Sequence, residues 1–303
     1  MTERLLSATA SQILKMSTAE LKQSIKASEG RIIMAENMVI YKPLVDQITN
    51  AEIHAGFSAD MLLMNFFDLN RPFVNGLETT DDNLFEVIPN EESIRILKQL
   101  TGRVIGLNLE PIDKEAEMLE KRKDISTGRI ATTENLKKAN DMGFDFVCLT
   151  GNPRTGVDNK EILEAIKLAK ESFEGLVIAG KMHSAGVDES IIDIQTVEAF
   201  IEAGADIILV PAIGTVPDHD DEKQKAIVKK AHDKGALVMS SIGTSQESSS
   251  THTLEDIGIR NKICGVDIQH IGDCSSPETI YALSVAIRGT RHTFNRMSLS
   301  VNR

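Results

Sequence analysis

The chain has 303 residues, 41% of them hydrophobic, and a formal net charge of −12 at pH 7 with acidic and basic side chains interspersed. Its apolar content is high enough for a folded core, which excludes a disordered chain. The negative net charge with interspersed signs argues against binding of duplex nucleic acid through a basic face. The absence of an apolar run as long as a bilayer argues against a membrane protein.

Three cysteines, Cys148, Cys264 and Cys274, lie far apart and show neither metal-ligand spacing nor a CxxC motif. An odd number of widely spaced cysteines fits a reducing compartment better than a disulfide framework. The first residues lack the apolar core of a secretory signal. We therefore expect a cytoplasmic protein, and no linker-like segment divides the chain into separate domains.

The first thirty residues predict an N-terminal helical extension. Apolar residues recur at helical spacing within residues 11–28, and Ser17 begins the capping-box pattern S-T-A-E. We expect residues 1–30 to cap the bottom of a barrel that is formed by residues 31–303.

Eight helical stretches then end in a glycine, and each glycine is followed almost at once by an apolar strand. The predicted strands are residues 31–39, 60–68, 103–111, 144–152, 176–184, 206–214, 236–243 and 266–273. After the second strand they recur at intervals of roughly thirty to forty residues, about the length of one βα unit. This pattern predicts the α/β class and a single (β/α)8 TIM barrel.

In such a barrel, the loops at the C-terminal ends of the strands carry the active site. The loops at residues 69–90 and 111–132 are unusually long, which is typical of lids. The second of them contains the basic run Lys121-Arg122-Lys123, which could steer an anion or simply be a solvated charged segment.

The loops after the seventh and eighth strands predict a phosphate site, because glycines, hydroxyl groups and a helix N-terminus meet there. The candidate residues are Ser241, Gly243, Thr244, Gly272, Asp273, Ser275 and Ser276. Alternatively, the glycines only turn the chain and Ser276 only caps its helix. An ionised Asp273 would repel phosphate unless it pointed away or bound a cation.

Amide and guanidinium groups at other strand ends are candidates for holding the substrate. Asn152 and Arg154 follow the fourth strand, and Arg154 could bind a carboxylate or phosphate through two hydrogen bonds. Asn65 and Asn108 come shortly before acidic residues on the second and third strands. The expected ligand is a small phosphorylated metabolite.

Four residues are candidates for catalysis. Lys181 could form a Schiff base with a carbonyl substrate, stabilise an oxyanion, or only neutralise nearby carboxylates. Glu110 or Glu36 would be the general base, and His183 would act as an acid, a base or an orienting group.

The same strand ends could hold a divalent metal such as Mg²⁺ or Mn²⁺. Its ligands would come from Glu36, Asp68, Glu110 and His270, although these histidines and carboxylates could equally be ordinary strand-end residues. No GxGxxG motif follows a strand, and no P-loop, HExxH or GxSxG motif occurs.

The motifs AENMV, TGNPRTGVDN, AGKMHSAG and HIGDCSSPE together resemble an uncharacterised bacterial TIM-barrel family that is associated with phosphotransferase operons. Members are sometimes labelled haloacid dehalogenase-like hydrolases, but the DxDx[TV] nucleophile motif of those phosphatases does not occur here. More distantly, the chain is similar to BtpA-like barrels and to the phosphoenolpyruvate mutase/isocitrate lyase group. AGKMH shares a Lys and a nearby His with the KKCGH-type loop of that group.

We expect an enzyme of carbon metabolism that acts on a small phosphorylated sugar or keto acid by lyase, aldolase or isomerase chemistry. One alternative is a metal-dependent enzyme of phosphoester or C–C bond chemistry. Another is a non-catalytic barrel that senses a metabolite or serves as an assembly factor, which loss of a convergent polar cluster in the mouth would favour. Barrels of this kind commonly form homo-oligomers, but the sequence neither sets the oligomeric state nor locates an interface.

Overall fold

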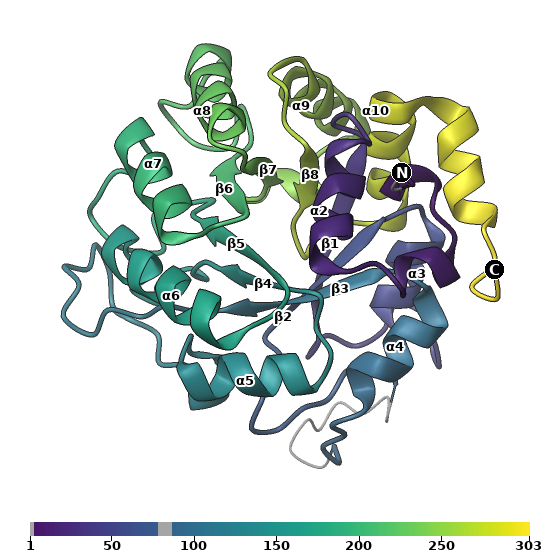
Figure 1. The fold of residues 1–303 in the computed structure, drawn as a ribbon, viewed down its shortest axis with the longest axis horizontal. Coiled ribbons are helices and arrows are strands. Elements are labelled where there is room, and N and C mark those ends of the chain that lie inside the picture. Colours follow the sequence, from purple (N-terminus) through teal and green to yellow (C-terminus); the bar gives the residue numbers. More distant parts are fainter. Residues whose placement is uncertain (1–2, 78–86) are drawn as a thin grey trace.

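The computed structural model describes residues 3–77 and 87–303, and its centre is a closed barrel of eight parallel strands (Figure 1). The strands are β1 (Ile32–Met38), β2 (Met61–Asn65), β3 (Val104–Leu109), β4 (Phe146–Leu149), β5 (Leu176–Gly180), β6 (Ile207–Pro211), β7 (Leu237–Ile242) and β8 (Ile268–Ile271). They pair in chain order, and β8 closes the barrel against β1. The predicted (β/α)8 barrel is confirmed.

Helices surround the barrel (Figure 1). They are α1 (Ala10–Ile13), α2 (Thr18–Lys26), α3 (Asn50–Gly56), α4 (Ser93–Thr101), α5 (Thr133–Asp141), α6 (Asn159–Ser172), α7 (Ile194–Ala203), α8 (Asp221–Asp233), α9 (Thr251–Ile263) and α10 (Pro277–Ser298), with single 3-10 turns at η1 (Leu5–Ser7), η2 (Thr127–Arg129) and η3 (Gln246–Ser248). Within the described residues, none of these helices is long and apolar enough to span a bilayer. The first of the two long loops includes residues 78–86, which lie outside the described part of the chain.

The strands are buried on both faces, which explains their nearly continuous apolar sequences. On β1, Ile33 and Ala35 pack outward against the helices, whereas Ile32 and Met34 pack inside the barrel. The next inward position on β1 is Glu36. At this level the side chains inside the barrel change from apolar to polar. The layer nearest the C-terminal ends of the strands is therefore a candidate functional site.

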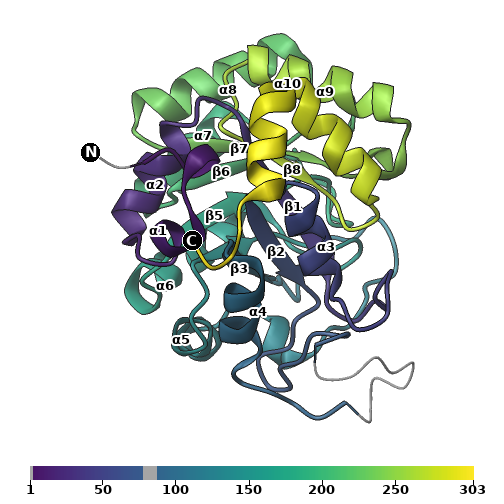
Figure 2. The ribbon, with the colours of Figure 1, turned by 90° about the vertical axis from the view of Figure 1, so that its right-hand side faces the viewer.

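The N-terminal segment covers the opposite, N-terminal end of the barrel. Leu5, Leu6 and Ile25 are fully buried in the same cluster as Ile32 and Met34. Figure 2 shows the C-terminus beside α1, and the Ser11 N–H donates to the Arg303 carbonyl at 2.7 Å.

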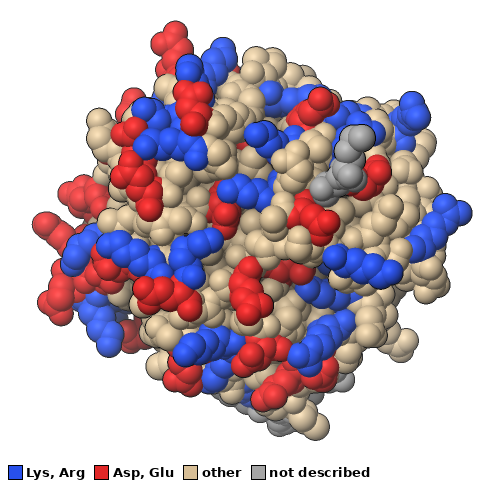
Figure 3. All heavy atoms as spheres, viewed as in Figure 1, with Lys and Arg blue, Asp and Glu red and all other residues tan. Residues whose placement is uncertain are grey.

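On the face seen in Figure 3, basic and acidic side chains are mixed.

Four aspartates join neighbouring strands by hydrogen bonds at the N-terminal end of the barrel. They stand directly before the even-numbered strands, at Asp60, Asp145, Asp206 and Asp267. Each carboxylate accepts the backbone N–H of one residue of the preceding strand at 2.8–3.1 Å. Each aspartate N–H donates back to the carbonyl of that same residue at 2.8–2.9 Å. We call these pairs of contacts the aspartate bridges.

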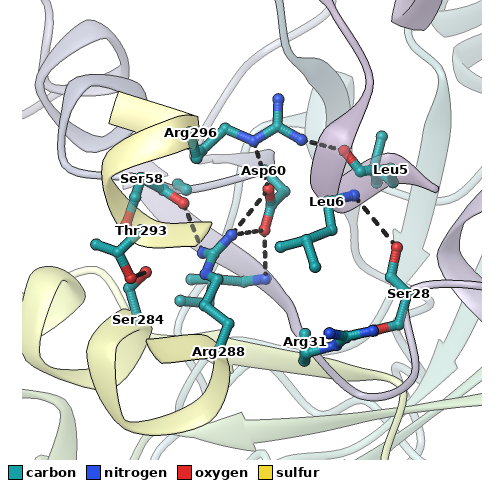
Figure 4. A network of polar contacts seen from close by, with 12 residues as sticks. Leu5, Leu6, Ser28, Arg31, Ser58, Asp60, Ser284, Arg288, Thr293 and Arg296 are labelled. Carbon is teal, nitrogen blue, oxygen red and sulfur yellow. Dashed lines mark hydrogen bonds and ion pairs between the residues drawn. The ribbon is translucent and has the colours of Figure 1, made fainter. Parts of the chain in front are cut away.

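The bridge at Asp60 is also the centre of a buried arginine cluster (Figure 4). Arg288 Nη1 lies 3.0 Å and Arg296 Nε 2.8 Å from its carboxylate, and all three side chains are at most 1% exposed. Both arginines belong to α10, so the cluster fixes the last helix to the start of β2. Arg103 adds a third buried guanidinium, which donates to the Ala59 carbonyl at 2.8 Å. Burial, with Arg296 nearby, lowers the pKa of Arg103 to about 9.

The backbone at the end of β5 makes a close approach that only glycine permits. Gly180 has φ +146°, and a Cβ atom there would lie 2.1 Å from the carbonyl oxygen of Leu209 on β6. Gly180→Ala should therefore lower the free energy of unfolding by about 3 kcal/mol or more. Gly235→Ala is the matched control, because φ is +81° with nothing within 4 Å, and it should cost about 1 kcal/mol. Equal urea midpoints for the two variants would contradict this.

Candidate functional site

Three adjoining cavities hollow the C-terminal mouth of the barrel. The main cavity, of about 360 Å³, lies over the ends of the strands. The second cavity, of about 300 Å³, lies between the loops after β1 and β8. The third cavity, of about 250 Å³, is lined from the loops after β1 to β4 and by Asp273. Asp273 lines all three, so they form one candidate site.

Most of the residues predicted from the sequence meet in this mouth. The main cavity is lined by Glu36, Asn65, Asn108, Asn152, Arg154, His183, Gly243, Thr244, Gly272 and Asp273. Ser275 and Ser276 line the second cavity. The predicted residues that line none of the three are Asp68, Glu110, Lys181, Ser241 and His270.

Three asparagines form a hydrogen-bonded group on the cavity floor. Asn65 Nδ2 donates to Glu36 Oε1 at 2.5 Å and to Asn152 Oδ1 at 2.8 Å. Asn65 Oδ1 accepts from Asn108 Nδ2 at 3.1 Å. The Oδ1 of Asn108 and the Oγ1 of Thr150 are buried on the cavity wall without a hydrogen-bond partner among the described residues. Buried polar atoms are normally satisfied, so these two are suited to a polar ligand.

Glu36 joins the cavity to a buried histidine and serine. Its Oε2 lies 3.3 Å from His270 Nε2, close enough for an ion pair, although the ring nitrogen is not aligned for a hydrogen bond. Ser241 Oγ lies 2.8 Å from His270 Nδ1. Burial alone would raise the pKa of Glu36, but His270 and Asn65 outweigh it and hold the pKa below its usual value. Glu36 is therefore an ionised carboxylate on the wall of the cavity.

His183 is held in one tautomer. The Ala185 N–H donates to His183 Nδ1 at 2.9 Å, so the proton of the neutral ring stands on Nε2. Burial lowers the pKa of His183 to about 4, against the opposing charge of Glu36. At neutral pH this residue is thus an uncharged hydrogen-bond donor that lines the main cavity.

The Glu110 carboxylate is engaged in hydrogen bonds and an ion pair within the protein. Its carboxylate accepts from Arg129 Nη2 at 2.5 Å, and from the side chain and backbone N–H of Asn152 at 3.0 and 2.9 Å. It is fully buried, and the Arg129 guanidinium stacks 3.8 Å from the centre of the Phe66 ring. Glu110 therefore positions Asn152, and the geometry gives no support to its predicted role as general base.

Lys181 is not brought to the cavity. It is 1% exposed, and its Nζ lies 2.7 Å from Glu189 Oε1. That same oxygen accepts the backbone N–H of Asn159 at the start of α6. The lysine is thus a buried ion pair that ties the loop after β5 to a helix, and a Schiff base at Lys181 has no geometric support.

The predicted metal ligands do not assemble as a set. Glu36 and His270 are neighbours, but Glu110 is paired with Arg129, and Asp68 accepts from the Asn70 N–H at 2.8 Å outside the three cavities. Instead, the described residues bring together Glu247, Asp273 and Cys274, whose ligand atoms lie within 4.8 Å of one another.

The predicted phosphate loops are built differently from the expectation. Ser276 Oγ accepts the Thr279 N–H, so this hydroxyl caps α10. Thr244 Oγ1 donates to the Thr215 carbonyl at 2.6 Å. A Cβ at Gly272 would lie 3.2 Å from Glu247 Cγ, so the space over this glycine holds a carboxylate side chain. The acidic side of the mouth disfavours phosphate at this position.

Sequence reasoning missed Glu247, Tyr41 and Arg129. Glu247 comes from the turn Q-E-S of η3, and Tyr41, from the loop after β1, lines the second and third cavities together with Asp273. No sequence motif marks Glu247 or Tyr41 as a functional residue. Thr244 and Ser245, directly before η3, have φ of +55° and +74°, a strained backbone that residues other than glycine seldom adopt. Such strain is typical of functional loops, but the sequence does not reveal it.

The closed barrel and its polar mouth define a (β/α)8 barrel with a candidate site at the C-terminal ends of the strands. A family model matches residues 6–303, and the chain belongs to the family described as "Domain of unknown function (DUF7916)". No curated protein matches the chain.

Several solved structures share the fold. 2,3-Dimethylmalate lyase, a phosphoenolpyruvate mutase/isocitrate lyase superfamily member, has a TM-score of 0.51 at 12% identity over 87% of this chain and 81% of its own. A putative lyase/mutase from Burkholderia cenocepacia J2315 has a TM-score of 0.51 at 16% identity over 93% and 85%. The homocysteine methyltransferase MmuM from Escherichia coli has a TM-score of 0.52 at 10% identity over 86% and 97%.

These identities show a common fold and no more. The expected distant similarity to the phosphoenolpyruvate mutase/isocitrate lyase group is confirmed at the level of the fold. The haloacid dehalogenase label and the phosphotransferase-operon association find no support in the comparisons.

Proposed function

We propose that this chain is a lyase-type enzyme that forms or breaks a C–C bond in a small 2-oxo acid through an enolate. The observation that carries the proposal is Glu36, a buried and ionised carboxylate on the cavity wall. Keeping a charge in such a place costs stability, and charged groups of this kind gather at catalytic sites.

The polar floor would hold the oxygen atoms of the substrate. Asn108 and Thr150 line the main cavity, as Glu36 does, and their Oδ1 and Oγ1 atoms are buried without a partner among the described residues. A hydroxyl or carboxyl group of a small acid could complete their hydrogen bonds. An apolar ligand would leave both atoms unsatisfied, which would lower its affinity.

Charge is divided across the mouth, and this division favours one orientation of the substrate. Lys123, Arg129 and Arg154 line the third cavity, on the side of the loops after β3 and β4. Glu247 and Asp273 come from the loops after β7 and β8, and Asp273 also reaches the third cavity opposite these basic groups. The carboxylate or phosphate end of the substrate would therefore bind on the basic side, where guanidinium groups give paired hydrogen bonds.

The reaction needs a base and a stabilised oxyanion. Glu36 would remove a proton from the carbon next to the carbonyl group, and the electron pair of that C–H bond would form the enolate. The Nε2–H of neutral His183 would donate to the enolate oxygen as its negative charge develops. His270 and Ser241 would hold the Glu36 carboxylate in place from below.

The similar folds are consistent with this class of reaction without deciding it. One is a 2,3-dimethylmalate lyase and another a putative lyase/mutase, whereas a third is a homocysteine methyltransferase. A fold hosts many reactions, so the site must carry the argument. The polar cluster converges in the mouth, and the feature that would favour a non-catalytic barrel is therefore absent from the described residues.

Exchange of the protons next to a carbonyl group tests the proposal before the full substrate is known. We expect the protein to speed the loss of the C3 proton signals of pyruvate or 2-oxobutyrate in D2O, measured by NMR with and without Mn²⁺. Rates equal to those of protein-free solutions for both acids under both conditions would contradict the proposed enolate chemistry.

Arg154 provides a test of the basic side. Its side chain is about half exposed and lies 3.9 Å from Glu120, so it remains accessible to a ligand. Arg154→Gln should raise the keto-acid concentration for half-maximal exchange about tenfold, with little change in the maximal rate, because a charge-assisted hydrogen bond is lost. Arg95→Gln, on the outer helix α4, is the control. An unchanged half-maximal concentration in Arg154→Gln would place the anion elsewhere.

A further inference from the structure

Two acidic side chains approach each other where the loops after β7 and β8 meet. Glu247 comes from η3, and Asp273 follows β8 with Cys274 next to it. One ligand atom from each lies within 4.8 Å of the others, and Glu247 and Asp273 both line the main cavity. Glu247 packs over Gly272, where a larger residue would push it away.

One oxygen of Glu247 has no partner. The side chain is 7% exposed, and its Oε2 is buried without a hydrogen bond from any described residue. An unsatisfied carboxylate oxygen in such a position is costly, because burial removes water and nothing replaces it. This orphan oxygen is independent of the closeness of the acidic groups, and it points to a missing positive ligand.

The surroundings make the cost larger. Burial, the charge of Asp273 and the charge of Glu36 raise the pKa of Glu247. Burial and Glu36 likewise raise the pKa of Asp273. The other titratable groups that act on the pair are Tyr41, His270 and Cys274. Three carboxylates thus share one region, and the largest influences on the pair include no lysine or arginine.

We propose that Glu247 and Asp273 bind a hard divalent cation, Mg²⁺ or Mn²⁺, at the edge of the main cavity. Carboxylate oxygens are the ligands that these ions prefer, and a cation would complete the orphan oxygen and relieve the repulsion. The Cys274 sulfur is a soft ligand and hard ions such as Mg²⁺ select oxygen, so the thiol is not expected to bind the ion. The site does not depend on the proposed reaction.

Titration with Mn²⁺ alone, without any keto acid, tests the site. We expect saturable binding of one ion by calorimetry and a rise in melting temperature with Mn²⁺ concentration. Glu247→Gln and Asp273→Asn should each weaken Mn²⁺ binding about tenfold or more, because each removes a charged ligand. Affinity should fall as the pH is lowered, because protons compete for the same carboxylates.

The Glu247→Gln substitution should weaken Mn²⁺ binding and yet stabilise the metal-free protein. Without metal it should melt at a higher temperature than the original chain, because the unsatisfied buried charge is gone. With Mn²⁺ the original chain should gain stability and the variant should not. A protein damaged by the substitution would instead melt lower under both conditions.

Two control variants complete the experiment. Asp68→Asn removes a carboxylate at another strand end and should leave Mn²⁺ binding unchanged. Cys274→Ser should also bind Mn²⁺ normally. The proposal is overturned if Glu247→Gln and Asp273→Asn bind Mn²⁺ like the original chain, or if no Mn²⁺ binds. Loss of binding in Cys274→Ser would show a thiolate site instead of a hard-ion site. Failure of proton exchange with normal Mn²⁺ binding would reject only the proposed enzyme chemistry.

Discussion

Replacement of Asp60 by asparagine should lower the free energy of unfolding by about 3–5 kcal/mol, the range for breaking a buried ion pair. Its carboxylate lies within 3.0 Å of Arg288 and Arg296, and all three side chains are shielded from water (Figure 4). The amide of asparagine can still accept the Ile33 N–H, so the aspartate bridge can persist. The loss arises because the guanidinium groups remain buried without their counter-charge.

Asp145→Asn is the matched control for this prediction. Asp145 forms the same type of aspartate bridge, to the Ile105 N–H, but its ion-pair partner is the single, partly exposed Lys98. Its replacement should cost about 1 kcal/mol, because this pair is partly exposed to solvent and leaves one lysine, not two buried arginines, without its partner. Urea unfolding of both variants measures the difference. If Asp60→Asn were no less stable than Asp145→Asn, the arginine cluster would not be held by its carboxylate.

Glu36→Gln should slow the exchange of protons next to the keto-acid carbonyl by about 100-fold to 10,000-fold, the usual contribution of a general base. Glutamine keeps the size of the side chain and can still accept from Asn65, so the asparagine group should stay in place. Far-ultraviolet circular dichroism and the melting temperature check that the fold is kept. Asp68→Asn makes the same chemical change outside the cavities and should exchange at the original rate.

The acid limb of the pH profile gives a second check on the base, in a range where His183, with a pKa of about 4, also gains its second proton. The pKa of Glu36 is held below the usual value, so the base is ionised throughout the neutral range. The exchange rate should therefore decline on the acid side only as the pH falls through that lowered pKa, near or below the ordinary pKa of about 4.3 for glutamate. A decline centred near neutrality would assign the base to a different group.

The barrel could be predicted because strand and helix periods repeat along the whole chain. A buried parallel strand must be apolar on both faces, and a polar residue such as Glu36 or His270 near its C-terminal end therefore marks the mouth. The strand-end residues could therefore be placed at the mouth as a group, although their roles stay predictions. Asn65 and Asn108 meet there because each lies on an inward position of its strand, and Asn152 joins them from the loop after β4.

The roles of individual side chains could not be predicted in the same way. Lys181 follows the unusual backbone of Gly180, and the side chain is taken up by Glu189 instead of the cavity. Glu110 is paired with Arg129, which comes from the turn η2 near the end of a long loop. Such pairings depend on loop conformation, and nothing in the local sequence sets it. Glu247 was missed for the same reason.

The spacing of the aspartate bridges shows how this barrel accommodates change. Asp145, Asp206 and Asp267 follow one another at intervals of 61 residues, whereas 85 residues separate Asp60 from Asp145. One aspartate bridge thus occurs in every two βα units. The first interval is longer than the other two, and its extra residues include the two long loops. The second of those loops brings Lys123 and Arg129 to the mouth. The base of the barrel acts as a constant frame, and new chemistry can be acquired by lengthening one module at its opposite end.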